Sequence, residues 1–129
     1  MRFLGIDYGA KRIGIAISDE AGTMAFPRGV FDNDSRAIAL LEQEVKDQHI
    51  GHIVVGDTKS YSGLRNPITD EVEEFVRALL KRTGVPVEQT FEAGSSIEAS
   101  RYAPEGAVHD DSAAAIILQR FLDTRRHLK

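Results

Sequence analysis

Apolar residues alternate with small or polar ones at the start of the chain, and this pattern predicts a hairpin of two short strands. Residues 13–17 read Ile-Gly-Ile-Ala-Ile, the period of two that is typical of a strand. Phe3, Leu4 and Ile6 form an earlier apolar strand, which the acid Asp7 closes. Gly9 stands where the backbone must bend without a side chain in the way. Alone, Asp7 is most simply interpreted as a residue of this turn.

The middle of the chain predicts a third strand, a helix and a fourth strand. Residues 23–31 have strand character, and Pro27 within them favours an edge position or a bulge. Apolar residues at helical spacing predict a helix from about residue 36 to residue 48, with candidate N-caps at residues 32–35. Residues 51–56 are nearly all apolar, as in a strand buried on both faces of a parallel sheet.

The remaining chain alternates helix and strand. After a polar loop, a helix is predicted to begin at Pro67 and to end at Gly84, a glycine C-cap. Residues 85–92 predict a strand, and residues 110–125 predict a final helix. The order β-β-β-α-β-α-β-α is typical of one α/β domain, here residues 1–129, with a mixed sheet and helices on both faces.

Composition narrows the class of protein. The chain has 129 residues, of which 42% are hydrophobic and 28% charged, as in a globular domain that can bury a core. It has no cysteine, so disulfides and thiolate metal sites are excluded and the cytoplasm is the expected location. No apolar run reaches the length of a membrane span and no signal-peptide pattern opens the chain, so we expect no membrane association.

The formal net charge is −4, which argues against a protein that coats nucleic acid through bulk electrostatics. It permits an enzyme that contacts a few phosphates through a local cationic patch. Candidates for such contacts are Lys11 and Arg12, beside Asp7, and Lys59 and Arg65 in the polar loop. They would position a nucleic acid without reading its sequence. Ordinary solvated surface charge is the alternative for Lys59 and Arg65.

Acidic residues stand at three comparable points of the predicted order. Asp7 closes the first strand, Glu92 closes the last strand, and Asp110 and Asp111 open the last helix. If the first, fourth and fifth strands are parallel neighbours, Asp7 and Glu92 lie at the carboxyl edge of the sheet, where α/β folds place their sites. Converging carboxylates repel one another unless a divalent cation joins them, and oxygen ligands favour Mg²⁺ or Mn²⁺. Two such ions can support hydrolysis of a phosphodiester.

Each acid also has a simpler interpretation. Asp110 and Asp111 are placed to complement a helix dipole, and Glu92 alone reads as a solvated loop residue. The residues by themselves therefore leave a metal site and a set of unrelated surface acids as alternatives.

Three stretches of the chain carry a resemblance to a known family. They are Asp-Tyr-Gly-Ala-Lys-Arg-Ile-Gly-Ile-Ala-Ile-Ser-Asp at residues 7–19, Ile-Val-Val-Gly at residues 53–56 and Asp-Asp-Ser-Ala-Ala-Ala-Ile-Ile-Leu-Gln at residues 110–119. In this order they closely resemble the YqgF family of pre-16S rRNA nucleases, which are also described as Holliday-junction-resolvase-like. The resemblance implies an RNase H-like fold, with a five-stranded mixed sheet of order 3-2-1-4-5 and an antiparallel second strand.

The resemblance also implies a site. Carried over by position, the family's catalytic and metal-binding acids match Asp7, Glu92 and Asp110, with Asp111 as a one-residue alternative for the third metal ligand. The implied cofactor is Mg²⁺ or Mn²⁺. The family's motif around the second acid usually reads Asp-Glu-Arg, whereas this chain has Phe-Glu-Ala at residues 91–93.

The implied function is a metal-dependent nuclease that processes the 5′ end of the small-subunit rRNA precursor and meets it in ribosomal precursor particles. A Holliday junction resolvase-like nuclease acting on branched DNA is an alternative. The altered motif around Glu92 and the negative net charge keep open a non-catalytic, degenerate nucleic-acid or pre-ribosome binding protein. An actin-like nucleotide phosphohydrolase is a further hypothesis, although such enzymes need two domains to enclose a nucleotide. The sequence leaves both monomer and homodimer open.

Overall fold

The computed structural model describes residues 1–56, 67–90 and 110–127, without the side chains of residues 67–69, 110–112 and 126–127. Within these residues the helices and strands follow the predicted order. They are β1 (Arg2–Tyr8), β2 (Arg12–Ser18), β3 (Ala25–Asp32), α1 (Ala37–Asp47), β4 (Ile50–Gly56), α2 (Pro67–Thr83), β5 (Val87–Thr90) and α4 (Asp110–His127).

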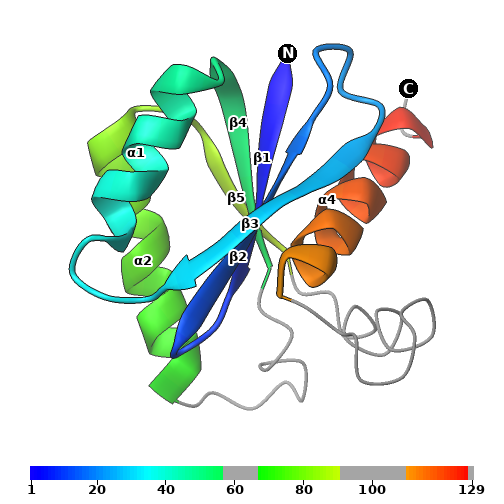
Figure 1. The fold of residues 1–129 in the computed structure, drawn as a ribbon. Helices are drawn as coiled ribbons and strands as arrows, with labels where there is room; N and C mark the ends of the chain where they lie inside the picture. The colour runs from blue at the N-terminus through cyan, green and yellow to red at the C-terminus, as the bar shows by residue number, and fades with distance from the viewer. Residues whose placement is uncertain (57–66, 91–109, 128–129) are drawn as a thin grey trace.

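The strands form a sheet in the order β3-β2-β1-β4-β5 (Figure 1). The central strand β1 pairs antiparallel with β2 and parallel with β4, and β5 continues parallel beside β4. β2 runs antiparallel to both of its neighbours. These pairings confirm the expected order 3-2-1-4-5 with an antiparallel second strand. They also bring the C-terminal ends of β1, β4 and β5 to one end of the sheet.

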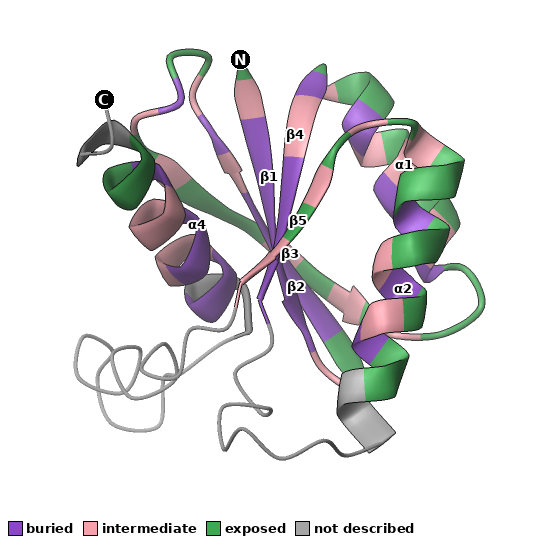
Figure 2. Ribbon diagram, turned by 180° about the vertical axis from the view of Figure 1, so that it is seen from behind, coloured by how far each residue is buried: buried purple, intermediate pink, exposed green. Residues whose placement is uncertain are grey.

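Helices cover both faces of the sheet, as predicted (Figure 1). In Figure 2 the buried side of each helix is turned toward the sheet, and β1 and β4 are buried along most of their length. The core under α1 and α2 consists of Leu4, Ile6, Tyr8, Ile13, Ile15, Ala37, Leu41, Val45, Ile50, Ile53, Val55, Val72, Phe75 and Leu79. The smaller core under α4 consists of Phe3, Ala16, Val54, Ala114, Ile117, Leu118 and Leu122. Strand alternation therefore turns the even-numbered residues of β1 toward α1 and α2 and its odd-numbered residues toward α4.

Local sequence signals explain several of these elements. β3 is an edge strand, and Pro27 pairs with Ala16 next to a shift in register between Ile15 and Ala16. Both features are those predicted from a residue that has no N–H to donate. Gly84 has a φ of +69°, and its N–H donates to the carbonyl of Leu80 at 2.9 Å. The glycine C-cap predicted for α2 is therefore confirmed.

The predicted caps of the first helix are wrong. α1 begins at Ala37, and its N-cap is Arg36, which makes no side-chain cap hydrogen bond. Asp34 instead accepts a hydrogen bond from the N–H of Arg36 at 2.9 Å, and this bond lowers the pKa of the Asp34 carboxyl. Asp34 therefore stabilises the turn before the helix rather than the helix itself.

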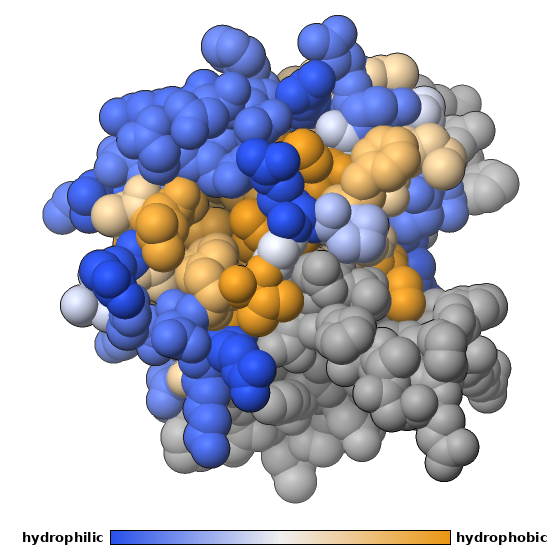
Figure 3. Space-filling view, viewed as in Figure 1, coloured by the Kyte–Doolittle hydropathy of each residue, from blue (hydrophilic) through white to orange (hydrophobic). Residues whose placement is uncertain are grey.

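The face that bears β3 shows apolar side chains across its middle (Figure 3). Among the large apolar residues of β3 and α1, Phe26, Val30 and Leu40 are 40–50% exposed. Apolar surface of the edge strand and of α1 therefore stays exposed. In the described part of the chain no helix has the length and apolar character needed to cross a membrane.

Candidate functional site

Asp7 is a buried carboxylate of the central strand, with 8% of its surface exposed. It follows Phe3 and Gly5 at intervals of two residues along β1, so alternation places it on the face that α4 covers. Its register partners are Gly14 on β2 and Gly56 on β4. The positions on both sides of the carboxylate therefore carry no side chain. A buried carboxylate needs compensating partners, and a cation is the strongest of these.

α4 lies antiparallel to β1 on this face (Figure 1). Near the start of β1, the rings of Phe3 and Phe121 have centroids 5.9 Å apart. Further along the strand, a methyl group added at Gly5 would lie 2.6 Å from Cβ of Leu118 and 3.1 Å from the carbonyl oxygen of Ala114. As β1 proceeds toward its C-terminal end, its contacts therefore move toward the N-terminus of α4.

From the spacing of strand and helix we expect the first turn of α4 to lie near Asp7. Two residues of a strand advance the chain by about 6–7 Å and one turn of helix by about 5.4 Å, so the step from Gly5 to Asp7 corresponds to the turn before Ala114. That turn begins at Asp110, which confirms that Asp110 opens the last helix. The side chains of Asp110 and Asp111 lie outside the described atoms, and their convergence with Asp7 stays a prediction.

Glycines of the sheet allow α4 to approach closely. A methyl group added at Gly56 would lie 2.7 Å from Cδ1 of Ile117, and the equivalent group at Gly5 would meet Leu118. The facing positions of the helix include Ala114, which is fully buried. The small residues in the opening stretch, in residues 53–56 and in residues 110–119 are thus explained by packing between α4 and the sheet.

The turn that follows Asp7 is held by Asn33, a residue that the sequence analysis missed. Nδ2 of Asn33 donates to the carbonyl of Gly9 at 2.9 Å, and its backbone N–H donates to the carbonyl of Lys11 at 2.9 Å. A methyl group at Gly9 would lie 2.5 Å from the carbonyl oxygen of Arg12, which confirms that this bend requires glycine. The available signal for Asn33 in the sequence is its place in the polar run at residues 32–35, a run that is also typical of helix caps.

Lys11 and Arg12 are exposed at the end of the sheet where Asp7 lies. Arg12 is two residues from Gly14 on β2, so it belongs to the same face of the sheet as Asp7. Among the described residues, neither cation forms an ion pair. Both cations therefore lie at the same end of the sheet as Asp7, and their contact with phosphate stays a prediction.

The other predicted site residues, Glu92, Lys59 and Arg65, lie outside the described residues. The described part of β5 ends at Thr90, so closure of that strand by Glu92 stays a prediction. The described residues alone contain no group of three His, Cys, Asp or Glu that could hold a metal ion. Within the described residues, the buried carboxylate of Asp7 and the position of Asp110 at the start of α4 fit the oxygen ligation that Mg²⁺ and Mn²⁺ favour.

Gln119 fastens α4 to the start of the edge strand. Its Oε1 accepts from the N–H of Ala25 at 2.8 Å, and its Nε2 donates to the carbonyl of Thr23 at 2.9 Å and to Oδ1 of Asp123 at 3.1 Å. The side-chain amide thus pairs with backbone groups as a neighbouring strand would. Gln119 entered the sequence analysis only through the family resemblance, and the structure gives it a role in orienting the helix.

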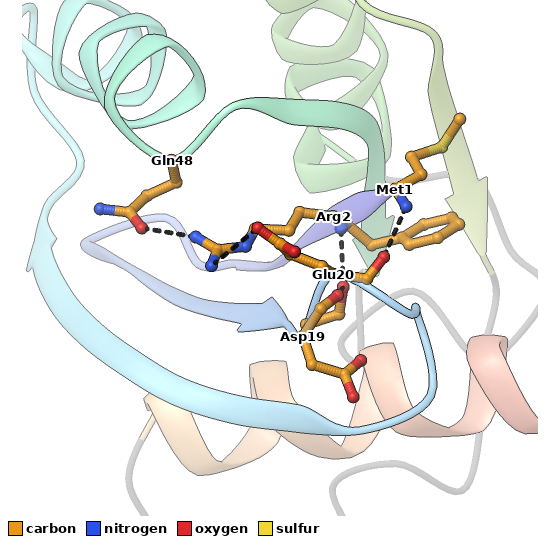
Figure 4. A network of polar contacts seen from close by, with 7 residues as sticks. Met1, Arg2, Asp19, Glu20 and Gln48 are labelled. Carbon is orange, nitrogen blue, oxygen red and sulfur yellow. Dashed lines mark hydrogen bonds and ion pairs between the residues drawn. The ribbon is translucent and has the colours of Figure 1, made fainter.

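Asp19, the last residue of the opening stretch, lies at the opposite end of the sheet. Its carboxylate accepts hydrogen bonds from the N–H and the hydroxyl of Thr23, both at 2.8 Å, and these bonds lower the pKa of Asp19. Figure 4 shows it beside Glu20, whose carbonyl accepts from the Met1 amino group and whose carboxylate lies 3.8 Å from Arg2. Asp19 therefore stabilises a turn at the far end of the sheet, and takes no part in the candidate site.

A half-buried histidine also lies toward this opposite end, on the α4 face. His52 stacks on Phe121 with ring centroids 5.7 Å apart and lies 5.4 Å from the ring of Phe3. Burial lowers the pKa of His52, and the carboxylate of Glu88 partly opposes that effect. Its buried Nε2 makes no hydrogen bond within the part of the chain that the structure describes. We assign His52 to the packing of α4.

Comparison with known sequences identifies related proteins. The model of the RuvX family, described as Holliday junction resolvase, matches residues 1–124. Curated relatives named "Putative pre-16S rRNA nuclease" include one from Oleidesulfovibrio alaskensis, 38% identical over 95% of this chain and 92% of the relative. Another, from Bordetella parapertussis, is 37% identical over 94% of this chain and 92% of the relative. A third, from Thermoanaerobacter pseudethanolicus, is 32% identical over 98% of this chain and 99% of the relative.

Solved structures share the fold. T. thermophilus RuvC in complex with Holliday junction substrate superposes with a TM-score of 0.63 at 18% identity, over 98% of this chain and 96% of that one. The Fowlpox virus Holliday junction resolvase gives 0.57 at 11% identity, over 96% of this chain and 99% of that one. At such identities the likeness concerns the fold, and it confirms the expected RNase H-like class.

Proposed function

This chain belongs to the RuvX family of Holliday junction resolvases, and from that premise we propose that it is a divalent-metal-dependent nuclease acting on the small-subunit rRNA precursor. The coarser conclusion, an enzyme that hydrolyses phosphodiester bonds, rests on the family and on relatives at 37–38% identity. The pre-16S rRNA substrate is carried over from the names of those relatives. Within the structure, the observation that carries the proposal is the buried carboxylate of Asp7.

The proposed metal ligands are Asp7, Glu92 and Asp110, with Asp111 as the alternative third ligand, and the proposed ion is Mg²⁺ or Mn²⁺. When bound, such an ion supplies charge stabilisation at the phosphate and a more acidic water. The protein's own contribution is rigid placement of the ligands. Asp7 is held in a strand with neighbours on both sides, and the helix that begins at Asp110 is fastened to the sheet through Gln119.

Four cations are proposed to contact backbone phosphates: Lys11, Arg12, Lys59 and Arg65. The exposure of Lys11 and Arg12 beside the strand end of Asp7 supports the first two. Contacts of this kind suit an enzyme whose net charge is −4, because attraction is then confined to the site. The proposed setting is the cytoplasm, with pre-rRNA met in ribosomal precursor particles.

The proposal is tested by incubating the purified protein with a labelled RNA that carries the small-subunit 5′ leader, in Mg²⁺, in Mn²⁺ or in chelator. We expect cleavage that requires the metal and that falls by at least about a hundredfold in Asp7→Asn, the order of loss when one electrostatic contributor to a transition state is removed. Asp19→Asn is the matched control, because that acid stabilises a turn at the far end of the sheet. Cleavage undiminished in Asp7→Asn would overturn the assignment.

Metal binding has an independent measurement in thermal unfolding. A ligand that binds the folded state raises the melting temperature, so Mn²⁺ should raise it for the wild type and much less for Asp7→Asn. A protein that binds the RNA without any metal-dependent shift or cleavage would instead be the non-catalytic alternative. Metal-dependent cleavage of a four-way DNA junction in preference to the RNA would favour the resolvase-like alternative.

A further inference from the structure

The β1–β2 turn is tied to the end of the edge strand by hydrogen bonds from one residue, Asn33. Asn33, directly after β3, bonds the carbonyl of Gly9 through Nδ2 and the carbonyl of Lys11 through its backbone N–H, both at 2.9 Å. Two carbonyls of one short turn are therefore fixed from outside the hairpin. A turn held in this way presents its other residues in one orientation, which reduces the ordering required when a ligand binds.

The residues that this turn presents are cations that form no ion pair with any described residue. Arg28 and Arg82 lie 3.0 and 3.2 Å from carboxylate oxygens of Glu44 and Glu42. By contrast, Lys11 and Arg12 are exposed and form no ion pair within the described chain. A solvated pair of cations is commonplace on a surface, but here the backbone beneath them is fixed.

The position of Arg12 relates these cations to Asp7. Arg12 lies two residues from Gly14, the register partner of Asp7, and on the same face of the sheet. Strand geometry places the Cα atoms of Arg12 and Asp7 roughly 8 Å apart, about two residues along one strand and one strand across. Asp32, the register partner of Arg12 on β3, makes no ion pair with it within the described residues. A phosphate bound by Arg12 would thus lie close to the metal ion that Asp7 is proposed to bind.

We infer that Asn33 is a positioning residue for nucleic-acid binding, which fixes the β1–β2 turn so that Lys11 and Arg12 receive backbone phosphates on the Asp7 face. The inference rests on the proposed nuclease function and adds a residue to it. Asn33 itself touches no substrate and acts through the turn. Its loss should weaken binding of the nucleic acid, raising KM, while kcat stays close to that of the wild type because Asp7 and α4 are unaffected.

The decisive experiment is a double-mutant cycle on the affinity for a labelled RNA, measured by fluorescence anisotropy with Ca²⁺ in place of Mg²⁺. Asn33→Ala should raise Kd about three- to tenfold, the effect of one hydrogen bond on an equilibrium. Lys11→Ala/Arg12→Ala should weaken binding and reduce the salt slope of log Kd by about 1–2. If Asn33 acts through these cations, Asn33→Ala should change Kd little further in the Lys11→Ala/Arg12→Ala background.

The control is Thr23→Val, which removes a side-chain hydrogen bond from the turn at the opposite end of the sheet. Its melting temperature should fall as that of Asn33→Ala does, but its Kd should equal the wild-type value. Asn33→Ser, whose hydroxyl is too short to replace the amide, serves if Asn33→Ala does not fold. An unchanged Kd in the Asn33 variants, or equal effects with and without the cations, would overturn the inference and leave the nuclease proposal standing. A wild type that binds no nucleic acid would overturn both.

Discussion

A methyl group at Gly5 should push α4 away from the sheet. The added carbon would lie 2.6 Å from Cβ of Leu118 and 3.1 Å from the carbonyl oxygen of Ala114, whereas carbon atoms in contact are about 3.5–4.0 Å apart. The helix must therefore retreat by about 1 Å, and overpacking of this kind costs about 1–3 kcal/mol. Lower entropy of the unfolded alanine chain offsets about 0.4–1 kcal/mol. We expect Gly5→Ala to lower the free energy of unfolding by about 1–2 kcal/mol.

Urea unfolding followed by circular dichroism measures that free energy. The matched control is Gly29→Ala on β3, where an added methyl group meets nothing within 4 Å and stability should be equal or higher. Leu118→Gly removes the Cβ that lies at 2.6 Å and should relieve this contact, so the double variant should lose less stability than the two single variants together. Gly5→Ala as stable as the wild type would refute the reasoning, because no close contact would then resist the methyl group.

Gly5→Ala also tests whether the position of α4 on the sheet affects the candidate site around Asp7. The helix begins at Asp110, so its retreat displaces the proposed third ligand relative to Asp7. A misplacement of about 1 Å can cost on the order of a hundredfold in rate, so cleavage should fall much further than the folded fraction does. Gly29→Ala should cleave at the wild-type rate. A Gly5→Ala protein that is destabilised yet fully active would show that the packing of α4 against the sheet does not control cleavage.

Two further substitutions test the packing of α4 and the titration of the half-buried His52. Burial lowers the pKa of His52 below its ordinary value of 6.5, so the unfolded chain binds this proton more readily than the folded protein does. The free energy of unfolding should therefore fall as the pH drops from 7 through 6.5 toward 5. Urea unfolding at each pH should show a smaller decline for His52→Phe than for the wild type, and an equal decline would contradict this. Gln119→Leu removes the bonds to the start of β3 and should lower the free energy of unfolding by about 1–3 kcal/mol. In Gln43→Leu the lost side-chain bond is an exposed one to Asp47, so this variant should change the free energy of unfolding by no more than about 0.5 kcal/mol.

Signals carried by neighbouring residues predicted the elements well. The period of two in residues 13–17, Pro27 at the edge and Gly84 at the end of α2 each depend on a few adjacent positions, and each is confirmed. The sheet order came from the family resemblance, because pairing of β1 with β4 joins residues that are far apart in sequence. The places of Asp7 near the end of β1 and of Asp110 at the start of α4 also follow from the local pattern of the element to which each belongs.

Contacts between distant segments were not predictable. Asn33 was read as a helix cap because its type suits caps, yet its partners are carbonyls of a turn more than twenty residues earlier. Gln119 bonds the backbone at residues 23 and 25, and nothing in its local sequence indicates that partner. Such side chains satisfy backbone groups left unpaired at an edge or a turn, and which groups are left unpaired is decided by the assembled sheet.

The two faces of the sheet are built for different purposes. Among the described residues, the core beneath α1 and α2 contains twice as many buried residues as the core beneath α4, so most of the apolar burial in this part of the chain lies away from the site. The α4 face can therefore accept glycines and a buried carboxylate, Asp7, at positions where apolar side chains would stabilise a sheet better. It follows that substitutions under α1 and α2 should act through the population of folded protein. Substitutions under α4 should act through the placement of the helix relative to Asp7.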